Sequence, residues 1–262
     1  SKPTNKFELI DDQGNTVTET LTKETIGINT VLHHQVLDVG SVKVGYLVFN
    51  SFLATSIDEL KPVLKEFLEA GIDELILDLR YNGGGRVNVA EYLAANIVGN
   101  RANGRNFIEF IYNEQQSQRN QEVTFNQAEY PLNLDRLITA SASELVINGL
   151  APFMDVVIVG ENTSGKPVGS FPFRYGGYAI SPISFKIAND NGEGEYFRGF
   201  APDAFVPDDL NHKFGDPEEL RLQEALYFIE NGLFLSGTAR QEPSTSKYQI
   251  EWRGFRQEIG AY

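Results

Sequence analysis

Two short apolar runs, Leu75–Leu79 (LILDL) and Val156–Val159 (VVIV), constrain the fold more than any other feature of this sequence. Their apolar residues are nearly continuous rather than alternating, which is typical of strands buried on both faces of a parallel sheet. Helical patterns stand between the strand patterns along the chain. This strand–helix rhythm predicts a layered α/β domain with crossover connections.

The other periodic segments predict the elements around these two strands. The segment Ile57–Leu68 has one apolar helical face and stops at Gly71, and Ser56-Ile57-Asp58-Glu59 at its start has the spacing of a capping box. Further strands are expected at Val42–Phe52, Phe107–Tyr112 and Tyr178–Ala188 (broken by Pro182), further helices at Val89–Val98, Ser141–Ala151 and Leu220–Ile229, and polar loops at Asn113–Asn126 and Asn189–Glu195.

Three parts of the chain are expected to differ in organisation. Residues 1–35 read as a β-hairpin, with strands at Phe7–Ile10 and Val17–Leu21 around a turn at Asp11–Asn15. Two strands are too little to fold alone, so the hairpin is either an edge of the main domain or the end of a further module. Residues 36–235 are expected to form the main domain, and residues 236–262 a polar C-terminal tail.

Composition excludes several classes of function. The chain has 22 Lys+Arg against 36 Asp+Glu, and the resulting net charge of −14 repels the phosphates of nucleic acids. It has no cysteine, which removes thiol catalysis, disulfides and cysteine zinc sites. No apolar run approaches the roughly 20 residues that a membrane-spanning helix needs. We expect no cofactor and no metal, and the sequence leaves the oligomeric state open.

Two other candidate sites are weak. The three histidines (His33, His34 and His212) form no H-E-x-x-H pattern, and no serine sits in a Gly-x-Ser-x-Gly elbow, so a Ser-His-Asp triad and a histidine metal site are unsupported. The segment Gly160–Lys166 has the spacing of a nucleotide-binding P-loop. However, Pro167 stands where a hydroxyl would hold magnesium, and it lacks the N–H that a phosphate cradle uses. We therefore expect no nucleotide.

Three motifs together carry the chemistry. Asp78–Gly85 runs from a buried strand into three glycines, whose unshielded N–H groups suit a developing oxyanion. Thr139–Glu144 (TASASE) places small residues at the start of a helix, and Thr163–Lys166 places a lysine on a tight turn after a buried strand. Each alone has a plainer interpretation: a strand-to-helix turn, a capping box from Ser141 to Glu144, and a solvated loop.

Taken together, these motifs resemble the C-terminal (tail-specific) processing peptidases, which are Ser/Lys serine proteases. The resemblance extends from about Val42 to Asp209 and includes the segments GYLVFNSF, LILDLRYNGGG, TASASEL, VVIVGENTSGKPVGS and GFAPDAFVPDD. Within the family, the sequence most resembles secreted or lipoprotein members of Bacteroidetes-type bacteria. The resemblance implies a crotonase/ClpP-like layered β-β-α core. It also implies an extracytoplasmic enzyme of the periplasm or cell envelope, with protein or peptide substrates.

The resemblance further implies the roles of single residues. Ser141 would be the nucleophile and Lys166, 25 positions later, the general base, because a serine hydroxyl needs a neighbour to take its proton. Oxyanion donors would be the N–H of Ala142, in the first turn of its helix, and that of Gly83 or Gly84. Glu144 and Ser170 would support the site. A lysine base must be neutral, so its pocket must exclude carboxylates.

The sequence departs from the family at three places. Ser170 stands where many members carry glutamine, a PDZ module ahead of the core is reduced to the hairpin, and Leu134–Thr139 is short of a strand plus a turn. We therefore expect either a chain break near Leu137–Ile138 or an extended connection that shifts Ser141 away from Lys166. An inactive relative that binds peptides or apolar ligands, and a crotonase-like acyl-CoA enzyme, remain alternatives.

Overall fold

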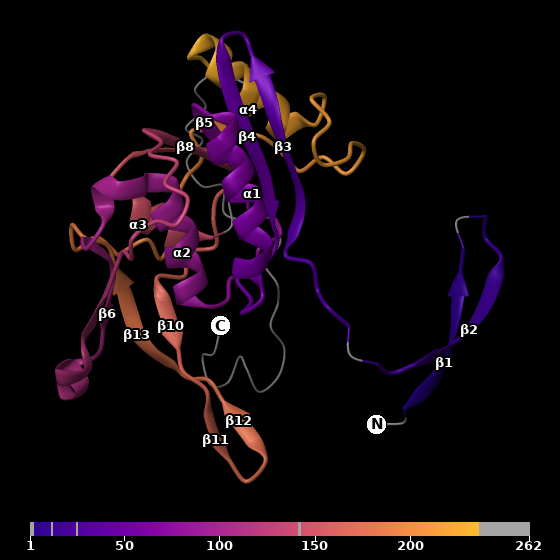
Figure 1. Cartoon of the computed structure of the whole chain (residues 1–262). Coiled ribbons are helices and arrows are strands. Elements are labelled where there is room, and N and C mark those ends of the chain that lie inside the picture. The colour runs from indigo at the N-terminus through magenta and orange to yellow at the C-terminus, as the bar shows by residue number, and fades with distance from the viewer. Residues whose placement is uncertain (1–2, 12, 25, 141–142, 236–262) are drawn as a thin grey trace.

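The computed structural model describes residues 3–11, 13–24, 26–140 and 143–235, and Figure 1 traces the chain. A six-stranded sheet runs through the centre of the main domain in the order β14-β9-β8-β5-β4-β3. All neighbouring strands in it are parallel except the edge pair β3 and β4. Its strands are β3 (Val31–Val39), β4 (Val42–Phe49), β5 (Glu74–Asp78), β8 (Arg136–Ala140), β9 (Asp155–Gly160) and β14 (Ala204–Phe205).

Helices cover both faces of this sheet. Side chains alternate between two cores: Leu75 and Leu77 of β5 join the larger core with α1 and α2, and Ile76 joins the smaller core with α4. The mixed α/β fold class predicted from the strand–helix rhythm is thus confirmed. The helices are α1 (Ser56–Ala70), α2 (Val87–Val98), α3 (Glu144–Leu150) and α4 (Leu220–Asn231), with short 3-10 turns η1 (Gly99–Ala102) and η2 (Glu114–Arg119).

A second, four-stranded antiparallel sheet has the order β10-β13-β6-β7, and in Figure 1 β10, β13 and β6 lie together beside α2 and α3. Phe107 of β6 and Phe185 of β13 enter the larger core, so both sheets share one hydrophobic interior. The strands are β6 (Asn106–Ile111), β7 (Gln121–Thr124), β10 (Val168–Ser170) and β13 (Ile183–Ala188); β11 (Phe173–Tyr175) and β12 (Tyr178–Ile180) form a separate hairpin between β10 and β13.

The N-terminal hairpin consists of β1 (Thr4–Ile10) and β2 (Thr16–Thr22), close to the predicted strands. The Asp11 carboxylate accepts hydrogen bonds from the N–H groups of Gln13 and Asn15 in its turn. Nearly every described residue of both strands is exposed, and Figure 1 shows the hairpin away from the main domain. The prediction that it is the end of another module stays a prediction, as do the three domain boundaries.

Several local predictions were wrong. The segment Asn113–Asn126 was expected to be a loop, but it contains η2 and β7, which pairs with β6. The capping box from Ser56 to Glu59 does not form, and the one from Ser141 to Glu144 begins outside the described residues. Glu59 accepts hydrogen bonds from the N–H groups of Thr30 and Val31 instead, which ties the start of β3 to α1. The tail from residue 236 lies outside the described residues.

The expected chain break near Leu137–Ile138 was also wrong. Both residues lie inside β8, where Leu137 pairs with Leu75 and Val156, and Ile138 with Ile76 and Val157. The segment therefore has room for the apolar strand. Strand β8 ends at Ala140 and α3 begins at Glu144, and residues 141–142 between them lie outside the described residues.

Candidate active site

The three sequence motifs meet at one cavity of about 410 Å³. Gly83, Gly84 and Gly85 reach it from the end of β5, Ser143 and Glu144 from the start of α3, and Lys166 and Ser170 from β10 and the turn before it. The carboxyl ends of parallel strands are where α/β folds gather functional loops. Ser141 and Ala142, the predicted nucleophile and oxyanion donor, lie outside the described residues.

The glycine loop is positioned by Asn82. Its side-chain amide donates to the Phe49 carbonyl oxygen at 3.0 Å, and its side-chain oxygen accepts from the Gly84 N–H at 2.8 Å. Gly84 has φ 87° and Gly85 φ 146°, a backbone that side chains rarely allow. The Gly83 N–H meets no acceptor among the described residues, and Gly83 is exposed at the cavity. Of the two predicted glycine donors, only Gly83 therefore offers a vacant N–H here.

Glu144 lines the same cavity as the glycine loop and binds the lysine turn. Its carboxylate accepts hydrogen bonds from the Thr163 hydroxyl, from the Gly165 N–H, and from the Lys166 N–H at 2.7 Å. The side chain is only 6% exposed, so these three donors compensate a charge that would be costly to bury alone. Glu144, predicted to support the site, thus holds the turn that carries Lys166. Its relation to Ser141 stays a prediction, because Ser141 lies outside the described residues.

The same contacts account for the P-loop-like spacing of this turn. In a nucleotide site the N–H groups of such a loop would face phosphate, whereas here those of Gly165 and Lys166 face the Glu144 carboxylate. Gly165 has φ 77°, and a Cβ there would lie 2.4 Å from the Phe197 carbonyl oxygen. The turn is thus closely packed, and the Glu144 carboxylate occupies the position where a phosphate would bind.

The Lys166 side chain lines the cavity and is exposed, so it is not a fully buried base. No carboxylate of the described residues forms an ion pair with it. Both carboxylate oxygens of nearby Glu144 accept hydrogen bonds from the main chain of the turn. A carboxylate at the amine would hold a lysine in its charged form, so this arrangement satisfies one requirement for a lysine base.

Tyr196 completes the wall of the cavity and was not singled out from the sequence. Burial, and secondly the negative charge of Glu144, raise the pKa of its hydroxyl well above the ordinary value. Tyr196 therefore stays a neutral phenol at any physiological pH and adds no second anion beside Glu144. No periodicity or motif in the sequence marks it.

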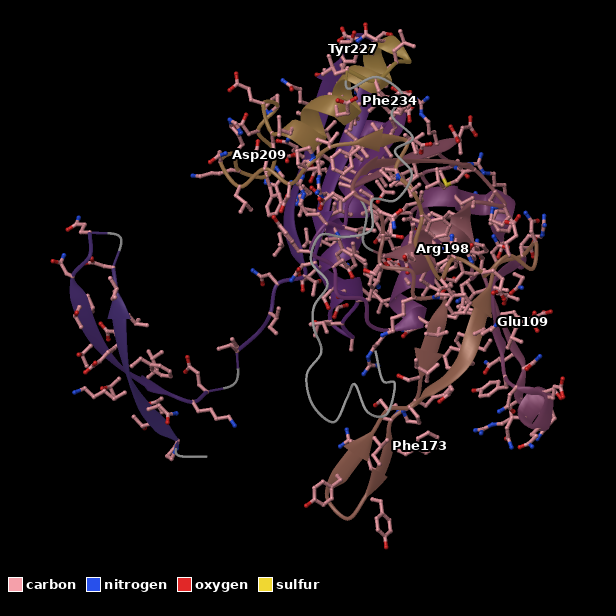
Figure 2. The ribbon with its side chains drawn as sticks, turned by 180° about the vertical axis from the view of Figure 1, so that it is seen from behind. Glu109, Phe173, Arg198, Asp209, Tyr227 and Phe234 are labelled. Atoms are coloured by element: carbon pink, nitrogen blue, oxygen red, sulfur yellow. The ribbon has the colours of Figure 1, made fainter. Side chains whose placement is uncertain are left out.

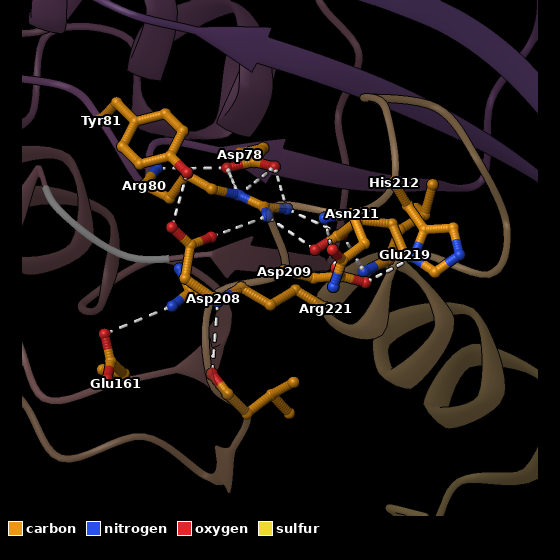
Figure 3. A network of polar contacts seen from close by, with 12 residues as sticks. Asp78, Arg80, Tyr81, Glu161, Asp208, Asp209, Asn211, His212, Glu219 and Arg221 are labelled. Atoms are coloured by element: carbon orange, nitrogen blue, oxygen red, sulfur yellow. Dashed lines mark hydrogen bonds and ion pairs between the residues drawn. The ribbon is translucent and has the colours of Figure 1, made fainter. Parts of the chain in front are cut away.

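A buried ionic network surrounds Arg80, which lies between β5 and the glycine loop in the sequence (Figure 3). Arg80 is 2% exposed and donates to Asp78 at 2.7–3.0 Å, to Glu219 at 2.6–2.8 Å and to Asp208 at 3.2 Å. Although burial alone would lower the pKa of Arg80, the hydrogen bonds that it donates to Glu219 and Asp78 raise this pKa above its ordinary value. The network joins the end of β5 to the start of α4. Its sequence signal was an Asp and an Arg inside an apolar run (LDLR).

The histidines do not contribute to the cavity. His212 pairs with Asp209 at 2.7 Å, and this contact raises the pKa of the imidazole. The two residues line a different cavity of about 460 Å³, and no serine is among its described lining residues. Among the described residues, no cluster of three or more acidic or histidine side chains could hold a metal ion. The described helices include none that is long and apolar enough to cross a membrane.

Comparison with known proteins decides the family. Residues 43–206 match peptidase family S41. The chain belongs to this family. The matched residues include all three motifs of the cavity, and members of the family act on peptide or protein substrates.

Individual S41 relatives agree with this assignment. The carboxyl-terminal-processing protease of Synechocystis is 26% identical over 86% of this chain and 53% of its own length. The chloroplastic carboxyl-terminal-processing peptidase 1 of Arabidopsis thaliana is 32% identical over 50% of this chain and 26% of its own. The chain thus spans about half the length of the curated cyanobacterial relatives that it matches.

Solved structures show the same fold. A Bacteroides fragilis protein described as an S41 protease has a TM-score of 0.73 at 25% identity, covering 86% of this chain and 65% of its own. The photosystem II D1 C-terminal processing protease has a TM-score of 0.55 at 19% identity, covering 82% and 58%. The predicted family and fold class are therefore confirmed.

Proposed function

We propose that this chain carries the catalytic centre of a serine endopeptidase that cleaves protein or peptide substrates near their C-terminal tails. The observation that carries the proposal is the convergence of the glycine loop, the start of α3 and the Lys166 turn on one cavity. Names of relatives such as carboxyl-terminal-processing protease support the preference for tails. The resemblance to secreted and lipoprotein members supports an extracytoplasmic location.

In the proposed mechanism, the Ser141 hydroxyl attacks the scissile carbonyl carbon while its proton passes to the neutral Lys166 amine. The negative oxygen is stabilised by the N–H groups of Ala142 and Gly83, each such donor being worth about 100- to 1000-fold in rate. The C–N bond then breaks, and the leaving amine takes the proton from Lys166. Water, again deprotonated by Lys166, hydrolyses the Ser141 ester. A substrate chain that fills the cavity would remove water from the exposed lysine and favour its neutral form.

Replacing the base while keeping its charge tests this mechanism. We expect Lys166→Arg to abolish cleavage of an unfolded protein substrate, because a guanidinium does not lose its proton in proteins. Lys186→Arg is the matched control: Lys186 lies on the adjacent strand β13, pairs with exposed Glu195 at 2.9 Å, and should tolerate the change. Turnover retained in Lys166→Arg eliminates the lysine as base.

The second candidate is an inactive relative that binds peptides or apolar ligands. It is favoured by the short connection between β8 and α3, where only residues 141–143 stand. A phosphonylating serine reagent followed by mass spectrometry separates the two: the peptidase acquires an adduct on Ser141, and the inactive relative does not. The same reagent on Lys166→Arg checks that any adduct depends on the base.

A further inference from the structure

The hairpin of β11 and β12 has two different faces. Phe173 pairs with Ile180 and Tyr175 with Tyr178, so these four side chains share one face, which we call the aromatic face. Arg174 and Ala179 pair on the opposite face. Gly176 and Gly177, with φ 55° and 83°, make the tight turn that two-residue hairpins favour. The hairpin is therefore a well-formed β-ribbon with one apolar side.

The aromatic face has no cover among the described residues. Its four side chains are 56%, 92%, 79% and 67% exposed in chain order, and Figures 1 and 2 show the hairpin, with Phe173 near its base, projecting from the main domain. Single exposed apolar residues are ordinary, but four on one face make a contiguous patch, which marks an interaction surface.

This patch is continuous with the candidate active site. Strand β10 lines the cavity along its whole length and leads directly to the hairpin. At the junction, the Phe171 ring lies 5.2 Å from Phe185, which lines the cavity, and 6.4 Å from Phe110. Gly169 leaves room for this stack, because a Cβ there would lie 2.3 Å from the Phe185 ring. Stacked aromatic rings thus connect the wall of the cavity to Phe171, two residues before the first residue of the hairpin.

We propose that the aromatic face docks an extended, apolar segment of the unfolded protein substrate and guides it to the cavity. This inference rests on the proposed function, since it names the substrate region that the same site takes. The partner is recognised by apolar contact, because Arg174 is the only charged residue between Phe171 and Ile183. A second copy of the chain is a poorer occupant, since two chains of net charge −14 repel each other.

The test separates docking from cleavage. One variant changes all four residues of the aromatic face to threonine, which keeps the β propensity of the ribbon. The control variant carries Arg174→Thr and Ala179→Thr on the opposite face. Reduced, carboxymethylated α-lactalbumin serves as unfolded substrate, and a short fluorogenic peptide, too short to reach the hairpin, as comparison. Binding of the unfolded protein is measured by fluorescence anisotropy in a Lys166→Ala background, so it does not require turnover.

We expect the aromatic-face variant to weaken binding of the unfolded protein at least tenfold and to raise its KM similarly, with kcat and peptide cleavage unchanged. The control variant should bind like wild type. If the full chain cleaves nothing but binding still depends on the aromatic face, the peptidase proposal fails and the docking proposal stands. Unchanged binding of the unfolded protein by the aromatic-face variant overturns the docking proposal. So does a change from dimer to monomer in sedimentation without a change in binding, which would assign the face to a second copy.

Discussion

Replacing the Glu144 carboxylate by an amide should both destabilise the protein and displace Lys166. In Glu144→Gln, the amide oxygen can still accept from the Thr163 hydroxyl and the Gly165 N–H. The amide nitrogen then faces the Lys166 N–H, which in the native protein donates to the carboxylate at 2.7 Å, so two donors oppose each other. One charge-assisted bond is lost and one buried donor is left unpaired. Such losses cost about 1.5–3 kcal/mol, and we expect about 3 kcal/mol.

For a chain of this size, about 3 kcal/mol lowers Tm by roughly 6–12 °C. The measurement is urea unfolding followed by circular dichroism, together with kcat and KM on the unfolded substrate, where kcat should fall more than KM rises. Glu195→Gln is the control, because it removes an exposed ion pair that contributes little. A Glu144→Gln variant as stable as the control would refute the argument that the carboxylate binds the turn.

Two further predictions concern the turn and the buried network. Gly165→Ala should destabilise the protein more than Gly104→Ala. Both glycines have φ near 75°, so both changes cost about 1–2 kcal/mol of backbone strain. Of the two, only Gly165 would place its new Cβ against backbone, at the Phe197 carbonyl oxygen. Equal losses in urea unfolding would contradict the close packing of the turn. Burial raises the pKa of the Glu219 carboxyl, but the hydrogen bonds that it accepts, first of all from Arg80, lower this pKa by more. In the folded protein the pKa of Glu219 therefore lies below its ordinary value of 4.5. The stabilisation from the Glu219 carboxylate is fully present above its pKa in the unfolded chain and is lost as the pH falls through its pKa in the folded protein. Glu219→Gln should therefore reduce the slope of the free energy of unfolding against pH on the acid side, and an unchanged slope would contradict this.

The elements that could be predicted from the sequence are those with local signals. The runs at Leu75–Leu79 and Val156–Val159 became β5 and β9, and the face of Ile57–Leu68 became α1, which ends at Gly71 in a left-handed conformation with φ 65°. For the two strands the signal is a continuous apolar run, and for α1 it is an apolar helical face followed by a glycine suited to the chain reversal. The strand within Asn113–Asn126 escaped prediction because β7 is an edge strand whose residues are polar and exposed except for half-buried Val123, and its pairing with β6 leaves no local signal in the sequence.

Carboxylates were predicted poorly because their partners are remote in sequence. Glu59 and Glu144 both have capping-box spacing, yet each binds N–H groups about 20 or more residues away. A capping box contributes only about 1 kcal/mol, so a buried carboxylate that finds two or three donors elsewhere forms those bonds instead. Motif convergence could be predicted, because three loops at the carboxyl ends of neighbouring strands must meet, but the donors that hold each loop could not.

Glu144 also bears on what the short connection after β8 can disturb. Thr163 donates to Glu144 and accepts from the Phe200 N–H at 2.7 Å, so the lysine turn is joined both to α3 and to the segment around Phe200. These bonds fix Lys166 relative to the first turn of α3 whatever the path of residues 141–143. The strand before them is also fixed, since β8 pairs on both sides up to Ala140. The described residues on both sides of this connection, Ala140 and Glu144, are therefore each held by bonds to neighbouring elements.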